Sequence, residues 1–135
     1  MAKGHRSQIK KERNETNVDR RPKAHAKFVR LADTKARIVL EQIKGKGVKE
    51  AAAILNYSPR YAAYIINKVL HSAIANAEHN LGMDPSTLYV EEAIANRGSA
   101  YYGRFRLSPR AKGRAYRTEI KMSHITLVLN EKKKK

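Results

Sequence analysis

The sequence predicts an α+β fold, with three helices packed on a small sheet and two antiparallel strands that continue outward as a long basic hairpin arm. Helical periodicity recurs three times between residues 33 and 81. The stretch from Arg97 to Lys121 holds eight cations, a single acid and no apolar run that could fill a core, yet strand-like sequence flanks it at Leu88–Ala95 and Ile125–Leu129. An isolated two-stranded ribbon is marginal in water, so we expect an anionic partner, such as nucleic acid, to hold the arm.

The composition indicates one domain with appendages and a polyanionic partner. The chain has 135 residues, with 29 Lys and Arg against 12 Asp and Glu, a net charge of +17 and a pI near 10.3. Such a charge favours nucleic acid over a membrane surface, because no run of eighteen apolar residues exists. Cysteine is absent, which excludes a disulfide framework, a thiolate nucleophile and a cysteine metal site. The N-terminus lacks the apolar region of a secretory signal, and we expect a cytoplasmic protein.

The two ends of the chain are predicted to lie outside the folded domain. Residues 1–23 contain only Ile9 and Val18 as branched aliphatics, so they cannot bury enough apolar surface to offset their ordering entropy. We expect a disordered basic tail that orders on its partner, or a solvated tail without a role. Residues 132–135 are four lysines and are expected to form a mobile tail. The folded domain, with its arm, then spans residues 24–131.

The domain is expected to start with a short strand and a capped helix. Residues Ala24–Leu31 alternate, which places Lys27 and Val29 on one face and Phe28 and Arg30 on the other. Asp33 or Thr34 can cap the helix that follows, and Gly45 and Gly47 end it. Its apolar stripe comprises Ala36, Val39, Leu40 and Ile43.

Two more helices follow before the strand that enters the arm. The second runs over about Val48–Tyr57. For the third, Ser58 suits the N-cap and Pro59 the first helical position, and the helix should run to about Asn80 before Leu81-Gly82 stops it. Its apolar stripe includes Ile66, Val69 and Ala73. The small alanines of this helix allow close packing against the other two.

Catalytic and metal-binding patterns are absent from the sequence. Glu91 and Glu92 are adjacent on a predicted strand, so they should point to opposite faces and cannot act as a carboxylate pair. Gly45-Lys46-Gly47 lacks the frame of a phosphate-binding loop. The five histidines show no metal-ligand spacing. We therefore expect no enzyme activity, no metal and no cofactor.

The arm has the residue pattern expected of a surface that binds RNA. Arginine dominates lysine there, and its planar fork pairs bidentately with phosphate and stacks on bases. Aromatic rings interleave with the arginines and can stack on unpaired bases, which structured RNA offers and duplex DNA does not. The candidate RNA-binding residues are Lys27, Arg30, Arg37, Arg104, Arg106, Arg110, Lys112, Arg114, Arg117 and Lys121.

The tip of the arm is predicted at residues 109–115. Pro109 withholds an amide and suits a bend, and Gly113 permits the positive φ that a tight reversal needs. Ala111 and Ala115 are small, so the backbone can lie close to a wall. The tip comprises Pro109, Arg110, Ala111, Lys112, Gly113, Arg114 and Ala115.

Four motifs in order resemble a known family. SAIANAEHN at 72–80, LYV at 88–90, PRAKGRA at 109–115 and SHIT at 123–126 are similar to the bacterial large-subunit ribosomal protein twenty-two family, over about Ala24 to Glu131. The resemblance implies three helices against a three-stranded sheet with one long hairpin. It also implies a domain near the polypeptide exit, bound to large-subunit (23S-type) ribosomal RNA, and a hairpin that lines the exit tunnel.

The resemblance further implies the partners of the protein, and the chain departs from the family pattern at two places. Ribosomal protein four is the expected neighbour beside the tunnel, the nascent polypeptide passes by, and no membrane or homo-oligomer is involved. The family is tied to early subunit assembly and to macrolide sensitivity. This arm begins with Gly98-Ser99 where the family has Gly-Pro, and it is a few residues longer around Tyr101–Gly103. The alternative to a structural ribosomal protein is a free nucleic-acid-binding module, such as a basic DNA-compacting protein. A third class, an enzyme acting on RNA, is disfavoured because the sequence has no acid–base constellation.

Overall fold

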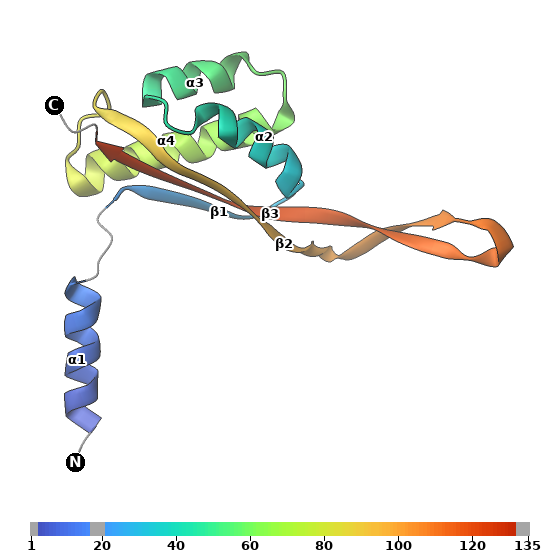
Figure 1. Cartoon of the computed structure of the whole chain (residues 1–135), viewed down its shortest axis with the longest axis horizontal. Helices are drawn as coiled ribbons and strands as arrows, with labels where there is room; N and C mark the ends of the chain where they lie inside the picture. The colour runs from blue at the N-terminus through green and yellow to red at the C-terminus, as the bar shows by residue number, and fades with distance from the viewer. Residues whose placement is uncertain (1–2, 17–20, 132–135) are drawn as a thin grey trace.

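The computed structural model describes residues 3–16 and 21–131 and has the elements of an α+β protein (Figure 1). Their bounds are α1 Lys3–Thr16, β1 Lys23–Val29, α2 Asp33–Ile43, α3 Val48–Tyr57, α4 Tyr61–Leu81, β2 Leu88–Pro109, the 3₁₀ turn η1 Ala111–Gly113 and β3 Ala115–Glu131. None of the described helices is long and apolar enough to cross a membrane.

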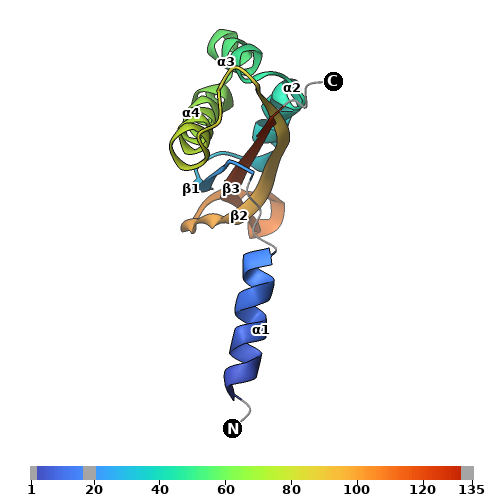
Figure 2. The ribbon, with the colours of Figure 1, turned by 90° about the vertical axis from the view of Figure 1, so that its left-hand side faces the viewer.

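The three described strands form one antiparallel sheet in the order β1-β3-β2. The central strand β3 pairs with β1 near its C-terminal end, as in Ala24↔Leu127, and with β2 along nearly its whole length. Helices α2, α3 and α4 lie on one side of this sheet (Figures 1 and 2). The predicted fold class and the three-stranded sheet are therefore confirmed.

The core lies between these helices and the inner face of the sheet. Leu40, Ile66 and Leu70 pack there with Leu127 and Leu129, all at most 1% exposed. Among the described residues, none between 96 and 124 belongs to this core cluster. The arm thus leaves the domain without sharing its core, as the sequence predicted.

The three domain helices were predicted with good bounds but with the wrong N-caps. Ala32 caps α2 without a side-chain bond, and Asp33 is the first helical residue. Ser58 caps the C-terminus of α3, where its N–H donates to the Ile54 carbonyl, and α4 begins only at Tyr61. The predicted stop of α4 is confirmed, because its C-cap Gly82 (φ +63°) takes the left-handed backbone that ends a helix. The extended Lys44 caps the end of α2, and Gly47, predicted to end that helix, is the N-cap of α3.

The N-terminal segment corrects the prediction of a disordered tail. Residues Lys3–Thr16 form helix α1, and the core cluster contains none of its residues 8–14, whose burial the structure describes. Lys, Arg, Gln and Glu have high helix propensity, so a helix can form here although the segment has almost no apolar side chains to bury. Arg21, also assigned to the tail, is ion-paired with Glu91 and Glu92. The lysine tail at 132–135 lies outside the described residues.

Strand β1 does not keep the alternation that the sequence suggested. The register with β3 shifts between Ala26 and Val29, and Phe28 has φ +55° with its side chain 58% exposed. Lys27, Phe28 and Arg30 are all exposed, so the assignment of these residues to two alternating faces was wrong. The cause is a β-bulge, which turns one residue out of the ladder and reverses the facing of those beyond it.

Candidate nucleic-acid interface

The arm is a continuation of β2 and β3 beyond the edge of the domain (Figure 1). Its outer part is a regular ladder from Phe105↔Glu119 to Pro109↔Ala115. At a rise of about 3.4 Å per residue, β3 extends roughly 25 Å from Ser123 to the tip. Because so long a ribbon carries no core residue, charge and ring contacts dominate its surface.

The chain reverses at the predicted tip. Arg110 N–H donates to the Arg114 carbonyl at 2.8 Å, and η1 makes the turn between them. Lys112 (φ +59°) and Gly113 (φ +69°) both take left-handed backbone. Glycine does so without steric cost, whereas lysine pays about 1 kcal/mol or more. The positive φ predicted for Gly113 is confirmed, and that of Lys112 was missed.

Outgoing strand β2 is longer than returning strand β3 at the root of the arm. Between the pairs Ala100↔Lys121 and Phe105↔Glu119, β2 contains residues 101–104 whereas β3 contains only Ile120. A second shift lies between Arg97 and Ala100. The extra residues noted around Tyr101–Gly103 are therefore accommodated as an irregularity in one strand. Such bulges re-aim the side chains that they carry.

All ten side chains proposed to bind RNA are exposed. Seven lie on the arm: Arg104, Arg106, Arg110, Lys112, Arg114, Arg117 and Lys121. Lys27 and Arg30 extend this basic surface onto β1 and the link that follows it. Arg37 is partly engaged within the protein, because its Nη2 lies 3.5 Å from Asp33 Oδ2 and its Nε donates to the Ala95 carbonyl at 3.3 Å.

The interleaved aromatic rings of the arm already stack on arginines of the same chain. Arg117 Cζ lies 4.6 Å from the ring centroid of Phe105, and Arg110 Cζ lies 5.6 Å from that of Tyr116. Tyr101 contacts two guanidiniums, those of Arg30 and Arg104. These contacts hold each guanidinium near a ring, and all four arginines remain exposed to solvent. The rings that were expected to stack on bases therefore contact arginines of the same chain in this structure.

Several exposed residues of the domain escaped the sequence reasoning. Phe28 is held outward by its N–H, which donates to His124 Nδ1 at 3.0 Å, and by an edge-on contact between the two rings at 4.7 Å. Tyr61 and Tyr64 are 68% and 61% exposed at the start of α4. A hydrogen bond from Lys68, together with the charge of that ammonium, lowers the pKa of the Tyr64 hydroxyl. Aromatic residues at exposed positions next to cations were the available signal.

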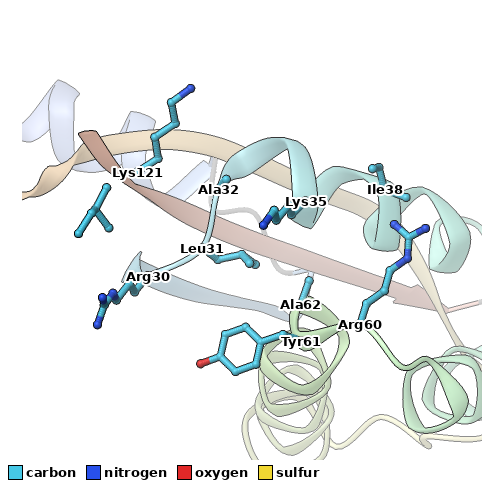
Figure 3. A pocket seen from close by; sticks show the side chains of 10 residues that line it. Arg30, Leu31, Ala32, Lys35, Ile38, Arg60, Tyr61, Ala62 and Lys121 are labelled. Atoms are coloured by element: carbon cyan, nitrogen blue, oxygen red, sulfur yellow. The ribbon is translucent and has the colours of Figure 1, made fainter. Parts of the chain in front are cut away.

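A hollow of about 580 Å³ lies where the arm joins the helices (Figure 3). Its lining comes from the β1–α2 link, α2, the start of α4 and strand β3: Arg30, Leu31, Ala32, Lys35, Ile38, Arg60, Tyr61, Ala62, Ile120 and Lys121. The sequence placed Arg30 and Lys121 at the interface but gave no reason to bring them together with α4.

The adjacent carboxylates Glu91 and Glu92 both bind the guanidinium of Arg21. Both Glu91 and Glu92 accept from Arg21 Nη1 at 3.0 Å. The expectation that they point to opposite faces was wrong, because the register with β3 shifts between Val90 and Glu92 and lets neighbouring side chains reach one guanidinium. Within the described parts of the chain, no group of three or more potential ligands could hold a metal ion.

Fold and surface together define a small α+β protein with a long, exposed, strongly basic β-hairpin arm. The sequence profile of the family described as ribosomal protein L22p/L17e matches residues 24–130. The chain is 58% identical over 132 residues to "Large ribosomal subunit protein uL22" of Lachnospira eligens, covering 98% of this chain and all of that one. It is 53% identical to the protein of that name from Lachnoclostridium phytofermentans, over 98% of this chain and all of that one. A further relative, from Clostridium tetani, is 54% identical over 82% of this chain and 96% of its own length.

The chain belongs to the ribosomal protein L22p/L17e family. This is a family of structural ribosomal proteins and not of enzymes. The predicted membership is therefore confirmed. The protein is a structural constituent of the large subunit of a bacterial ribosome and resides in the cytoplasm with it.

Proposed function

We propose that this protein binds large-subunit ribosomal RNA through its arm and the adjoining basic face of the domain, and that the arm lines the polypeptide exit tunnel. The observation that carries the proposal is an arm with eight exposed cations, no described residue in the core cluster and a length of roughly 25 Å. Such an element contributes little to the stability of its own domain, so its purpose is contact with something else. Phosphate is the complementary chemistry.

The tip, residues 109–115, then shapes the wall past which the nascent polypeptide moves. It is narrow, because its seven residues include two alanines, one glycine and one proline. All seven are exposed. Ribosomal protein four is the proposed neighbour at this point, and the domain stays near the polypeptide exit. We propose that the protein acts as a single copy and not as a homo-oligomer, because a net charge of +17 opposes self-association.

A salt-wash experiment on large subunits tests the RNA-binding part of the proposal. The chain should remain with the subunits through a high-salt wash, because an arm enclosed by RNA is held by shape as well as charge. A free DNA-compacting protein would wash off as counterions return. In-cell crosslinks from Arg104, Arg106 and Arg117 should map to large-subunit RNA, whereas Lys49 on α3 serves as the control position. Release by salt, with crosslinks spread over DNA, would contradict the proposal.

Assembly and tunnel roles are tested separately. Depletion of the protein should accumulate immature large subunits if it supports early assembly. Deletion of Arg104–Arg106 should shift the arm and alter the response to macrolides more than it alters assembly, because the contacts of the domain remain. Wild-type drug response together with wild-type pausing on tunnel-sensing nascent peptides would contradict the tunnel position of the arm.

A further inference from the structure

We propose that the hollow between the arm root and helices α2 and α4 receives a single unpaired nucleotide of the bound RNA. The proposal rests on the RNA-binding function argued above and assigns it a specific pocket outside the arm. The volume of about 580 Å³ lies within the range of roughly 300–1,000 Å³ typical of small-molecule sites.

The floor and wall of this hollow suit a planar apolar ring. Leu31 and Ala62 are 7% and 3% exposed and form the buried base. Tyr61 and Ile38 stand at the opening with 68% and 47% of their surface exposed (Figure 3). A nucleobase placed on the Tyr61 ring would cover this apolar surface, and base–aromatic stacking is the usual way in which proteins hold splayed bases.

The rim of the hollow suits a phosphate. Four cations line it, namely Arg30, Lys35, Arg60 and Lys121, and none of the lining residues is acidic. They come from separate elements, namely the β1–α2 link, α2, the start of α4 and β3. The nearby carboxylate of Asp33 is ion-paired with Arg37 and does not neutralise them. An apolar peptide would leave these charges unpaired, and a second copy of this basic chain would add to them.

The pocket also requires that the nucleotide be unpaired. In an A-form helix the bases are stacked inside, and side chains reach only the shallow groove and the backbone. Tyr61 can therefore stack only on a base that has left the helix, as at a bulge or in a loop. Arg30 links this pocket to the arm, because its guanidinium also lies 5.3 Å from the Tyr101 ring centroid. A nucleotide held here would thus lie next to the RNA that the arm contacts.

The test compares two RNA hairpins that differ only in a single-nucleotide bulge, each closed by a non-nucleotide linker so that no loop base is offered. Each is titrated with the full-length protein at several salt concentrations. Tyr61→Ala should weaken binding to the bulged hairpin about five- to hundredfold, the range expected for loss of one stacked base, and leave the paired hairpin unchanged. Tyr61→Phe should retain the preference. Tyr57→Ala is the matched control, since Tyr57 is 90% exposed but does not line the hollow. Lys35→Gln and Arg60→Gln should each lower the salt slope for the bulged hairpin by about one unit.

The outcomes separate this proposal from the broader function. Equal affinities of wild-type protein for the two hairpins, or equal losses on both from Tyr61→Ala, would overturn the nucleotide pocket and leave RNA binding intact. Competition by an acidic peptide that acts through Tyr61 but not through RNA would also overturn it and assign the hollow to a protein. Absence of any crosslink to large-subunit RNA would instead contradict the proposed function itself.

Discussion

The guanidinium of Arg30, which follows β1, lies 5.3 Å from the ring centroid of Tyr101 on the outgoing strand of the arm. Arg104 contacts the same ring at 5.6 Å. Tyr101 begins the stretch in which β2 has extra residues relative to β3, so the irregularity brings the ring back to the domain. The arm is therefore fastened at its root by a cation–π contact in addition to backbone pairing.

Removing this contact should loosen the arm without weakening the domain. Arg30→Gln loses a contact worth about 0.5–1 kcal/mol at an exposed site, which corresponds to a two- to fivefold faster hydrogen exchange of amides near the arm root. Lys27→Gln, on the same exposed stretch, is the control. Because Arg30 is exposed, the melting temperature of the domain should be unchanged. Unchanged exchange at residues 99–105 in Arg30→Gln would show that backbone pairing alone fixes the root.

The sequence could predict the arm but not how its strands are registered. The charge of the arm, its turn residues and the flanking apolar strands were local signals, and they located the tip correctly. The bulges near Phe28, Glu91 and Tyr101 were not predictable in this way, because each depends on the partner strand that the extra residue faces. Alternation, read along one strand, assumes a ladder without such shifts.

Local sequence patterns also failed to predict where two helices start and where the hollow near Tyr61 forms. Asp33 and Ser58 both have side chains that suit an N-cap, yet the backbone turns at Ala32 and Arg60 instead. Tertiary packing decided these starts, whereas Gly82 stopped its helix through its own backbone preference. The hollow near Tyr61 needs four segments to meet, and periodicity within each segment contains no information about the others.

Excision of the arm should leave a folded domain. The core cluster contains none of residues 99–119 whose burial the structure describes, so a short glycine-containing turn between Gly98 and Ile120 should preserve a cooperative thermal transition. The loss of RNA affinity should be large, because seven of the ten proposed contacts lie on the arm, all but Lys121 within the excised stretch. Circular dichroism follows the melt and filter binding follows the RNA. A non-cooperative melt of the excised protein would contradict the two-part architecture.

Two hydroxyls of β3 should respond to deletion in opposite ways. Ser123 is fully buried and its Oγ has no hydrogen-bond partner among the described residues, so Ser123→Ala should leave the free energy of unfolding unchanged or raise it by up to about 1 kcal/mol. Thr126 Oγ1 forms a hydrogen bond with His25 Nδ1 at 2.9 Å, so Thr126→Val should lower the free energy of unfolding by about 0.5–1.5 kcal/mol. Urea denaturation measures both. A clear loss in Ser123→Ala would indicate a buried water that bonds its hydroxyl.

At the tip, backbone shape and charge can be separated by two neighbouring substitutions. Gly113→Val keeps every charge but forces a β-branched residue to φ +69°, which should distort the turn at a cost of about 1–2 kcal/mol. Lys112→Gly keeps the left-handed turn, relieves the strain of a lysine at φ +59° and removes one cation. Both leave the core untouched, so the domain should melt at its normal temperature.

The two variants should therefore differ in what they change. Lys112→Gly should lower the salt slope of RNA binding by about one unit and leave amide exchange at residues 108–116 unchanged or slower. Gly113→Val should accelerate that exchange with the salt slope retained. In ribosomes, Gly113→Val should alter macrolide response and nascent-chain pausing if the shape of the tip matters, whereas Lys112→Gly should do so if its charge matters. Wild-type behaviour of both variant ribosomes would remove the tip from the tunnel wall.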